Sequence, residues 1–172
     1  MQQLYLTGED AAELADRLFT ALNVRPAGYR LTPFAVEGQV RGEALHLLMP
    51  PAAPMDNDVP CRIRLRTGDW AVVPRVLDEI AAPSLLQTLR LHTPVLLGGI
   101  TARMLTCTAF REAVVAVLEG SHPVIAAAAP DAREILCALT PADTQLWMSV
   151  PESAEERAGL LEALVAEAAM RF

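Results

Sequence analysis

Lysine is the residue type whose absence says most about this 172-residue sequence, because all 14 basic residues are arginine. Without lysine, neither Schiff-base chemistry nor the lysine of a phosphate-binding loop is available. The 21 acidic residues give a net charge of −7, which disfavours contact with nucleic-acid phosphates. No apolar run approaches the roughly 18 residues that a membrane helix needs. We therefore expect neither a nucleic acid nor a membrane as a partner.

Paired cysteines and closely spaced metal ligands are also lacking. The three cysteines are far apart and form no C-x-x-C pair, so we expect buried, reduced thiols at Cys61, Cys107 and Cys137. The three histidines do not lie at ligand spacing from one another; they are His46, His92 and His122. We expect no metal ion and no resident cofactor. The N-terminus carries Glu9 and Asp10 and no early basic residue, which argues against a signal peptide and predicts a cytoplasmic location.

Apolar strands alternate with amphipathic helices along the chain. Residues 3–7 read as a buried strand, and apolar residues recur at helical spacing from Ala11 to Leu22. The other expected strands cover residues 29–34, 36–49, 61–66, 95–97, 122–128 and 144–150. The other expected helices cover residues 73–91, with a break or kink at Pro83, then 108–119, 130–139 and a last helix capped by Ser153. This order predicts a three-layer α/β fold whose sheet is largely parallel and covered by helices on both faces.

We expect a single domain over residues 1–172, since a chain of this length fits one hydrophobic core. The proline-rich stretch 50–60 is then a surface loop, because each flank is too short for a separate domain. Residues 61–66 alternate between apolar side chains and arginines. They predict a half-buried strand with Ile63 and Leu65 facing inward and the arginines in solvent, where a row of guanidinium groups also offers an anion site.

Ligands in folds of this class bind beyond the carboxyl ends of the strands. One such end is the first strand–helix connection, where the motif G-x-x-x-x-G-K-[ST] would wrap phosphates, reach them with its lysine and hold Mg²⁺ with its hydroxyl. If Gly8 is the first glycine of this motif, the second glycine is replaced by Glu13. The lysine is then replaced by Leu14 and the hydroxyl residue by Ala15. The other end is a loop that we expect after Leu97.

On this register the chain resembles the small P-loop nucleoside-triphosphatase family of the thermophile type, also called cancer-related nucleoside-triphosphatase. Members open with an apolar strand and T-G-E-P-G-V-G-K-T, which LTGEDAAELA (residues 6–15) follows through its T-G-E. Their second motif, D-E-I-G-K-M-E before a helix that opens F-R, resembles residues 95–115, which contain Ile100 and Phe110-Arg111. HPVIAAAAP and SVPESAEER resemble the later segments P-V-x-A-T-I-P and T-P-E-N-R-D. The resemblance runs through most of the chain in the same order, but not through residues 45–70.

The resemblance implies RecA-like strand order and an ancestral ATP or GTP hydrolase. The family's catalytic groups are the loop lysine and threonine, an Asp near Mg²⁺ and a Glu beside the attacking water. All four lack counterparts, so we predict no catalytic residue here. In the second motif the Asp and Glu positions hold Gly98 and Gly99, with Arg103 just beyond, and we regard this motif as vestigial. The residues of the vestigial nucleotide-binding loop are Gly8, Glu9, Asp10, Glu13, Leu14 and Ala15.

Acidic residues gather where the first helix begins, at Glu9, Asp10, Glu13 and Asp16. Two unit charges about 4 Å apart interact by roughly 1 to 4 kcal/mol, so acids in place of lysine and Mg²⁺ weaken phosphate binding. Asp10 and Glu13 have the spacing of a capping box, in which carboxylates of the protein replace the phosphate. A divalent-metal site formed by these acids and residual nucleotide binding are the alternatives.

We predict a degenerate P-loop NTPase-like protein without efficient nucleotide hydrolysis, which acts as a binding or interaction scaffold. Its partner is an unknown protein or a second copy of the chain. One alternative is residual binding and hydrolysis of ATP or GTP with Mg²⁺, with arginines in place of lysine. A second alternative is different chemistry in the same crevice, carried by acids such as Glu9, Asp10 or Glu13.

Overall fold

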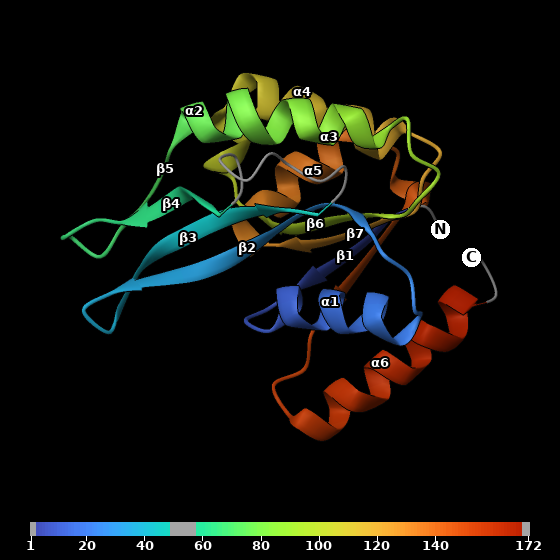
Figure 1. Cartoon of the computed structure of the whole chain (residues 1–172). Helices are drawn as coiled ribbons and strands as arrows, with labels where there is room; N and C mark the ends of the chain where they lie inside the picture. Colours follow the sequence, from blue (N-terminus) through green and yellow to red (C-terminus); the bar gives the residue numbers. More distant parts are fainter. Residues whose placement is uncertain (1–2, 49–57, 170–172) are drawn as a thin grey trace.

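The computed structural model describes residues 3–48 and 58–169, and within them one eight-stranded sheet lies between two layers of helices (Figure 1). The order across the sheet is β5-β4-β3-β2-β6-β7-β1-β8. The parallel strands are β1 (Gln3–Thr7), β2 (Ala27–Val36), β6 (Val95–Ile100), β7 (Val124–Ala128) and β8 (Gln145–Ser149). Three antiparallel strands extend the sheet beyond β2, namely β3 (Gln39–Leu47), β4 (Val59–Arg64) and β5 (Trp70–Val72). Most of the expected 50–60 loop lies outside the described residues.

The parallel half of the sheet has the RecA-like order. In this order β7 lies between β1, which leads into the first connection, and β6, which carries the second motif. One row of residues crosses all five strands in register: Gly28, Leu96, Ile125, Leu4 and Leu146. All five residues of β7 are buried, as expected for a parallel strand covered on both faces. The predicted three-layer, largely parallel fold is therefore confirmed.

Helices cover both faces of the sheet (Figure 1). One face carries α1 (Ala11–Ala21) and α6 (Ala154–Ala169), which pack on each other and close a core that contains Leu14, Leu18 and Phe19. The other face carries α2 (Pro74–Val76), α3 (Ala82–Thr88), α4 (Thr108–Glu119) and α5 (Arg133–Leu139). The amphipathic spacing in α4 buries Phe110, Val114 and Val117 in this second core.

A π-helical turn, Leu77–Ala81, lies between α2 and α3. The Ala82 N–H donates to the carbonyl of Leu77, five residues earlier. We expected the irregularity at Pro83, but the helix continues through that residue and is widened in the turn before it. Proline lacks an N–H and its ring crowds the carbonyl four residues earlier, so the preceding turn is the one that adjusts.

Two hairpins extend past the helices as an arm, which we define as residues 33–42 and 62–71 (Figure 1). Glu37 and Gly38 form the turn of the first hairpin, with φ of 52° and 77°, as a two-residue hairpin of type I′ requires. The inward position predicted within residues 61–66 is wrong for Ile63 in β4 and for Leu65, which directly follows that strand; they are 37% and 42% exposed. The reason is that helices do not cover the sheet along the arm.

The three thiols differ in their surroundings. Cys61 and Cys107 are buried as expected, whereas Cys137 on α5 is exposed, which corrects the prediction for that residue. Burial raises the pKa of Cys61 to about 12, with a smaller contribution from the nearby carboxylate of Glu43. Burial also raises the pKa of Cys107. Cys61 and Cys107 are therefore both in the unreactive thiol form at neutral pH.

Candidate functional site

The first strand–helix connection is a tight turn of three residues, 8–10, because β1 ends at Thr7 and α1 already begins at Ala11. The Ala11 N–H donates to the Gly8 carbonyl at 3.3 Å. Gly8 has a φ of +121°, and a β-carbon built on it would lie 3.4 Å from the carbonyl oxygen of Val150. The backbone here packs against the chain that follows β8 and is shorter than the loop of a G-x-x-x-x-G-K-[ST] motif.

Leu14 and Ala15 occupy the register positions of the lysine and the hydroxyl residue, and both lie within α1. Their exposed fractions are 1% and 0%. They belong to the same buried cluster as Leu6 of β1 and Val150 after β8. Both side chains are therefore part of the hydrophobic core between α1 and the sheet.

Two of the four acidic residues at the start of α1, Asp10 and Asp16, form ion pairs, and the predicted capping box at Asp10 and Glu13 is absent. The Asp10 side chain makes no capping hydrogen bond. It is paired instead with Arg157 of α6, whose Nη1 lies 2.7 Å from Asp10 Oδ2. Asp16 is paired with Arg30 of β2 at 2.5 Å. Glu9 and Glu13 are exposed.

Ser153 forms the local cap that the sequence predicts for α6. The Glu156 N–H donates to the Ser153 hydroxyl oxygen at 3.2 Å, and that hydroxyl donates to the Glu156 carboxylate at 2.9 Å. This cap fixes the start of α6, from which Arg157 reaches the first connection. The cap at α6 and the ion pair at α1 therefore belong to one contact between the two helices.

Gly98 and Gly99 lie within β6, so the loop that we expected to begin with them begins only after Ile100. A β-carbon built on Gly98 would lie 2.7 Å from both the Tyr29 carbonyl oxygen and the Arg30 Cα of β2. The Tyr29 hydroxyl donates to the carbonyl of Gly99 at 2.8 Å. The register of β6 with β7 shifts in this stretch. The glycines therefore allow close approach of two backbones at an irregular point of the sheet.

A cleft of about 290 Å³ lies between the β4–β5 hairpin and the segments that follow β6 and β7, and we call it the Arg103 cleft. Arg103 lines it and donates to the carbonyl of Trp70. Arg62 also lines it, with its guanidinium 4.7 Å from the centre of the Trp70 ring and 2.6 Å from the Glu43 carboxylate. The Nε of Arg62 is buried and makes no hydrogen bond to any residue within 3–48 and 58–169. Asp131 shares the cleft and accepts from the Ala102 N–H at 3.2 Å.

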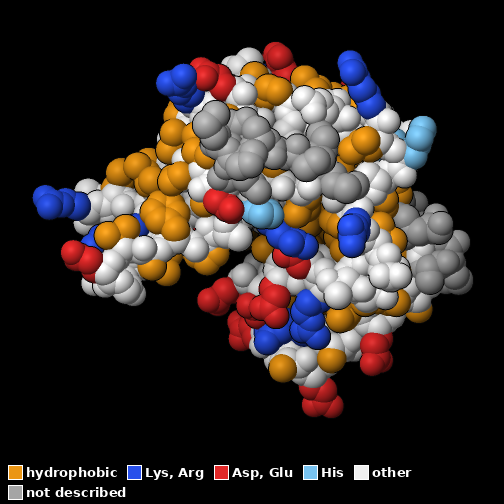
Figure 2. Space-filling view, viewed as in Figure 1, with side chains coloured by type: hydrophobic (Ala, Val, Ile, Leu, Met, Phe, Trp, Pro, Cys, Tyr) orange, Lys and Arg blue, Asp and Glu red, His pale blue; other side chains and the backbone are white. Residues whose placement is uncertain are grey.

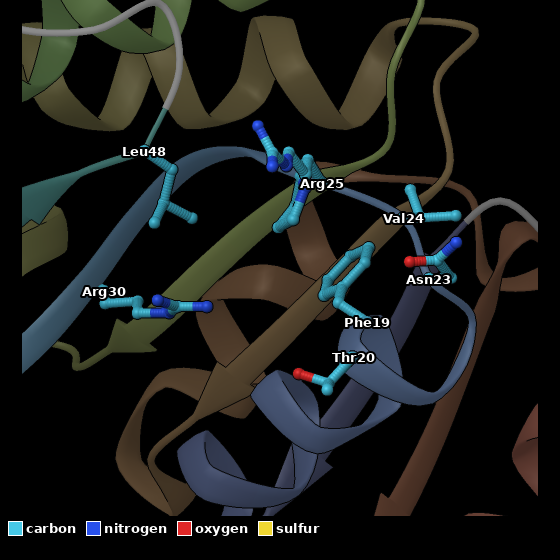
Figure 3. A pocket seen from close by; sticks show the side chains of 8 residues that line it. Phe19, Thr20, Asn23, Val24, Arg25, Arg30 and Leu48 are labelled. Atoms are coloured by element: carbon cyan, nitrogen blue, oxygen red, sulfur yellow. The ribbon is translucent and has the colours of Figure 1, made fainter.

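A larger cleft of about 570 Å³ lies at the C-terminal end of α1, and we call it the α1 cleft (Figure 3). The sequence did not predict it. Seven of its eight lining residues lie within residues 19–30, and Leu48, which follows β3, joins them only in the folded chain. The local signal in the sequence is the pair of arginines after the helix, Arg25 and Arg30. The lining residues are Phe19, Thr20, Asn23, Val24, Arg25, Pro26, Arg30 and Leu48.

The described residues contain neither a metal site nor a membrane-spanning helix. No three His, Cys, Asp or Glu side chains within residues 3–48 and 58–169 are grouped as a metal site. Over the same ranges, no helix has the length and apolar character needed to cross a bilayer. Glu9, Asp10 and Glu13, the acids of the alternative chemistry, line neither the Arg103 cleft nor the α1 cleft.

Strand order, helix layers and the position of the first connection together define a P-loop NTPase-like fold. The fold is similar to the crystal structure of THEP1 from the hyperthermophile Aquifex aeolicus, with a TM-score of 0.71 and 16% sequence identity. The similarity covers 95% of this chain and 97% of THEP1. No protein-family model matches the sequence, and none of the curated proteins matches it. At this identity the similarity establishes the fold alone.

Proposed function

We propose that this protein is a degenerate member of the P-loop NTPase-like fold class that acts by binding and does not hydrolyse nucleotides efficiently. The observation that carries the proposal is the burial of Leu14 and Ala15 in a helix that begins at Ala11. A phosphate-binding loop needs free backbone N–H groups around the phosphate and a cation beside it. Here the turn is short, and the side chains at the lysine and hydroxyl positions pack in the core.

The charges near the first connection support the same proposal. Glu9 and Glu13 are exposed at the end of α1 where a triphosphate would bind. Arg157, which reaches this turn from α6, is paired with Asp10. Charges of like sign about 4 Å apart repel by roughly 1 to 4 kcal/mol, so these carboxylates oppose an incoming phosphate group.

Two measurements test the absence of hydrolysis. Mg²⁺-dependent phosphate release from ATP and GTP is expected to stay at the level of a mock purification. The thermal midpoint is expected to be unchanged by millimolar nucleotide, whereas saturation at about 100 times Kd would add roughly 2.7 kcal/mol. Turnover that co-elutes with the protein in size-exclusion chromatography, together with a shifted midpoint, would refute the proposal.

The arm supports a role in protein interaction. Its exposed large apolar side chains gather on one projecting part of the surface (Figure 2), and they are Val36, Val40, Ile63 and Leu65. Exposed apolar groups that lie together are typical of interaction sites. The arm carries the exposed arginines Arg41, Arg64 and Arg66, and the start of α1 carries the exposed acids Glu9 and Glu13. Because the arm of one molecule can therefore pair with the start of α1 of another, we infer that the arm contacts a second copy of the chain.

Light scattering coupled to size-exclusion chromatography tests this inference. The wild-type protein is expected to show a concentration-dependent mass above that of the monomer. Ile63→Ser with Val36→Ser is expected to lower the mass to the monomer, while Leu86→Ser, a matched exposed apolar position on α3, leaves it unchanged. A strictly monomeric wild-type protein at all concentrations would refute self-association.

Residual binding of a phosphate-bearing ligand is the second candidate, and the Arg103 cleft is the observation that favours it. The cleft lies beyond β6 and β7, at the carboxyl edge of the sheet where ligands bind in such folds. Arg103 and Arg62 both line it and give it two guanidinium groups. Titration calorimetry with pyrophosphate tests it: Arg103→Gln is expected to weaken binding about tenfold, the effect of losing one charge-assisted hydrogen bond. No heat of binding to the wild-type protein would exclude it.

A further inference from the structure

The α1 cleft has the size and construction of a small-molecule site. Its volume of about 570 Å³ lies within the roughly 300 to 1,000 Å³ of ligand pockets. Phe19, which is 1% exposed, contributes an aromatic wall, and Val24 and Leu48 add aliphatic surface. Figure 3 shows Phe19 across the opening from Leu48 and Arg30, so the apolar and basic side chains face a common space.

One wall of the cleft is fixed by the way in which α1 ends. The Asn23 N–H donates to the Thr20 carbonyl at 3.1 Å, and the Val24 N–H donates to the Phe19 carbonyl at 3.1 Å. With Asn23 at a φ of 54°, these bonds form a Schellman cap, in which Val24 packs on Phe19. The wall is therefore held in place by main-chain hydrogen bonds and does not need a ligand to form.

Two guanidinium groups give the cleft positive charge. Arg30 is held by Asp16, whose Oδ1 lies 2.5 Å from its Nε, and this contact leaves the terminal Nη groups without a bond to any described residue. Arg25 is exposed and forms no ion pair within residues 3–48 and 58–169. Asp16 offsets the charge of Arg30, but no acidic residue lines the cleft itself. Arg25 therefore gives the cleft an excess of positive charge on a chain that carries −7 as a whole.

We propose that the α1 cleft binds a small amphipathic anion, meaning a molecule with a carboxylate or phosphate group attached to an apolar body. Arg25 and Arg30 donate charge-assisted hydrogen bonds to the anionic group. Phe19, Val24 and Leu48 contact the apolar body. The site differs from the nucleotide crevice of the fold, because it lies at the opposite end of α1, whose 11 residues span about 16 Å. It holds whether or not nucleotides bind at the first connection.

A fluorescence titration with anilinonaphthalenesulfonate, an aromatic sulfonate, provides the direct test. We expect saturable binding at one site per chain. Octanoate is expected to displace the dye at a concentration about tenfold lower than octanol, which lacks the charge, and lower than acetate, which lacks the apolar body. Equal displacement by octanol and octanoate would overturn the proposal, because the charge would then contribute nothing.

Three variants locate the binding. Arg25→Gln is expected to weaken octanoate binding about three- to tenfold. Arg17→Gln, with the same change of charge at an exposed position of α1 outside the cleft, is expected to leave the affinity unchanged. Thr20→Trp places a bulky side chain at an exposed position of the rim and is expected to abolish dye binding. Since all three positions are exposed, an unchanged thermal midpoint shows that each variant is folded.

These variants distinguish specific binding in the α1 cleft from a diffuse electrostatic effect and from binding elsewhere. Equal weakening by Arg25→Gln and Arg17→Gln would show a diffuse electrostatic effect and overturn the proposal. Dye binding that persists in Thr20→Trp would place the dye elsewhere and also overturn it. Sedimentation with vesicles of anionic phospholipid, without displacement of the dye by free octanoate, would identify a membrane surface as the ligand and reject a free small molecule.

Discussion

Replacing Leu14 with lysine restores the central residue of a phosphate-binding loop in the sequence, yet we expect it to destabilise the protein without creating nucleotide binding. Leu14 is 1% exposed and packs between α1 and the sheet. Removing a buried leucine side chain costs about 2 to 5 kcal/mol. A lysine there must also bury its ammonium group or direct it out along its stem. We expect the free energy of unfolding of Leu14→Lys to fall by about 3 to 5 kcal/mol.

Urea denaturation followed by circular dichroism measures this loss. For a chain of this size each kcal/mol lowers the thermal midpoint by about 2 to 4 °C, so the midpoint should fall by about 6 to 20 °C. Leu14→Met is the matched control, because it preserves the apolar volume and costs less than about 1.5 kcal/mol. The same curves are measured with Mg²⁺ and ATP, and no nucleotide-dependent stabilisation is expected.

The opposite result would refute the reasoning from burial. If Leu14→Lys were as stable as the wild type and gained about 2.7 kcal/mol from saturating nucleotide, the start of α1 would have to unwind into a loop. The three-residue turn would then be one of two accessible conformations. A large loss of stability in Leu14→Met as well would show that the packing around residue 14 tolerates no change in side-chain shape. The charge of lysine would then not be the cause of the loss in Leu14→Lys.

Three further results are expected. Gly98→Ala should destabilise the protein by about 1 to 3 kcal/mol, because the added methyl group clashes with backbone atoms of β2. Gly99→Ala should cost less, because its methyl group contacts only the Leu31 side chain, and thermal unfolding compares the midpoints of the two variants. Iodoacetamide at pH 8 should add one adduct to the native protein, at Cys137, and mass spectrometry of intact protein showing two or three adducts would contradict the burial of the others. Arg157→Gln should lower stability by less than about 1 kcal/mol, since its pair with Asp10 is partly exposed; an equal loss in 1 M salt would show that packing, not charge, is responsible.

The elements with a strong local pattern could be predicted from the sequence. The bounds of β1 and α4 agree with the prediction at both ends. In each case the hydrophobic period and the flanking residues indicate the same structure, so no distant contact has to decide between alternatives. The layer order also follows, because apolar strands separated by helices can bury both faces of a sheet in few ways.

The site could not be predicted to the same depth, because its contacts join distant segments. Asp10 has the local spacing of a helix cap, but Arg157, near the other end of the sequence, is its partner. The Gly98-Gly99 pair has the composition of a loop, and only the proximity of the β2 backbone explains why both residues lie in a strand. Local patterns predict a residue's backbone state, whereas an ion pair or a close backbone approach depends on the whole topology.

The two segments that resemble motifs of the nucleoside-triphosphatase family have a common physical character. Leu14 and Ala15 are buried in the core between α1 and the sheet, and Gly98 lies against the backbone of β2. Each position contributes to packing. A single substitution toward the motif of a hydrolase therefore destabilises the fold through a steric clash or the burial of a polar group, whether or not a nucleotide is present. Several changes would therefore have to occur together to build a phosphate-binding loop at this position. Substitutions on the exposed arm and at the rim of the α1 cleft meet no such penalty, and these are the surfaces that we propose for binding.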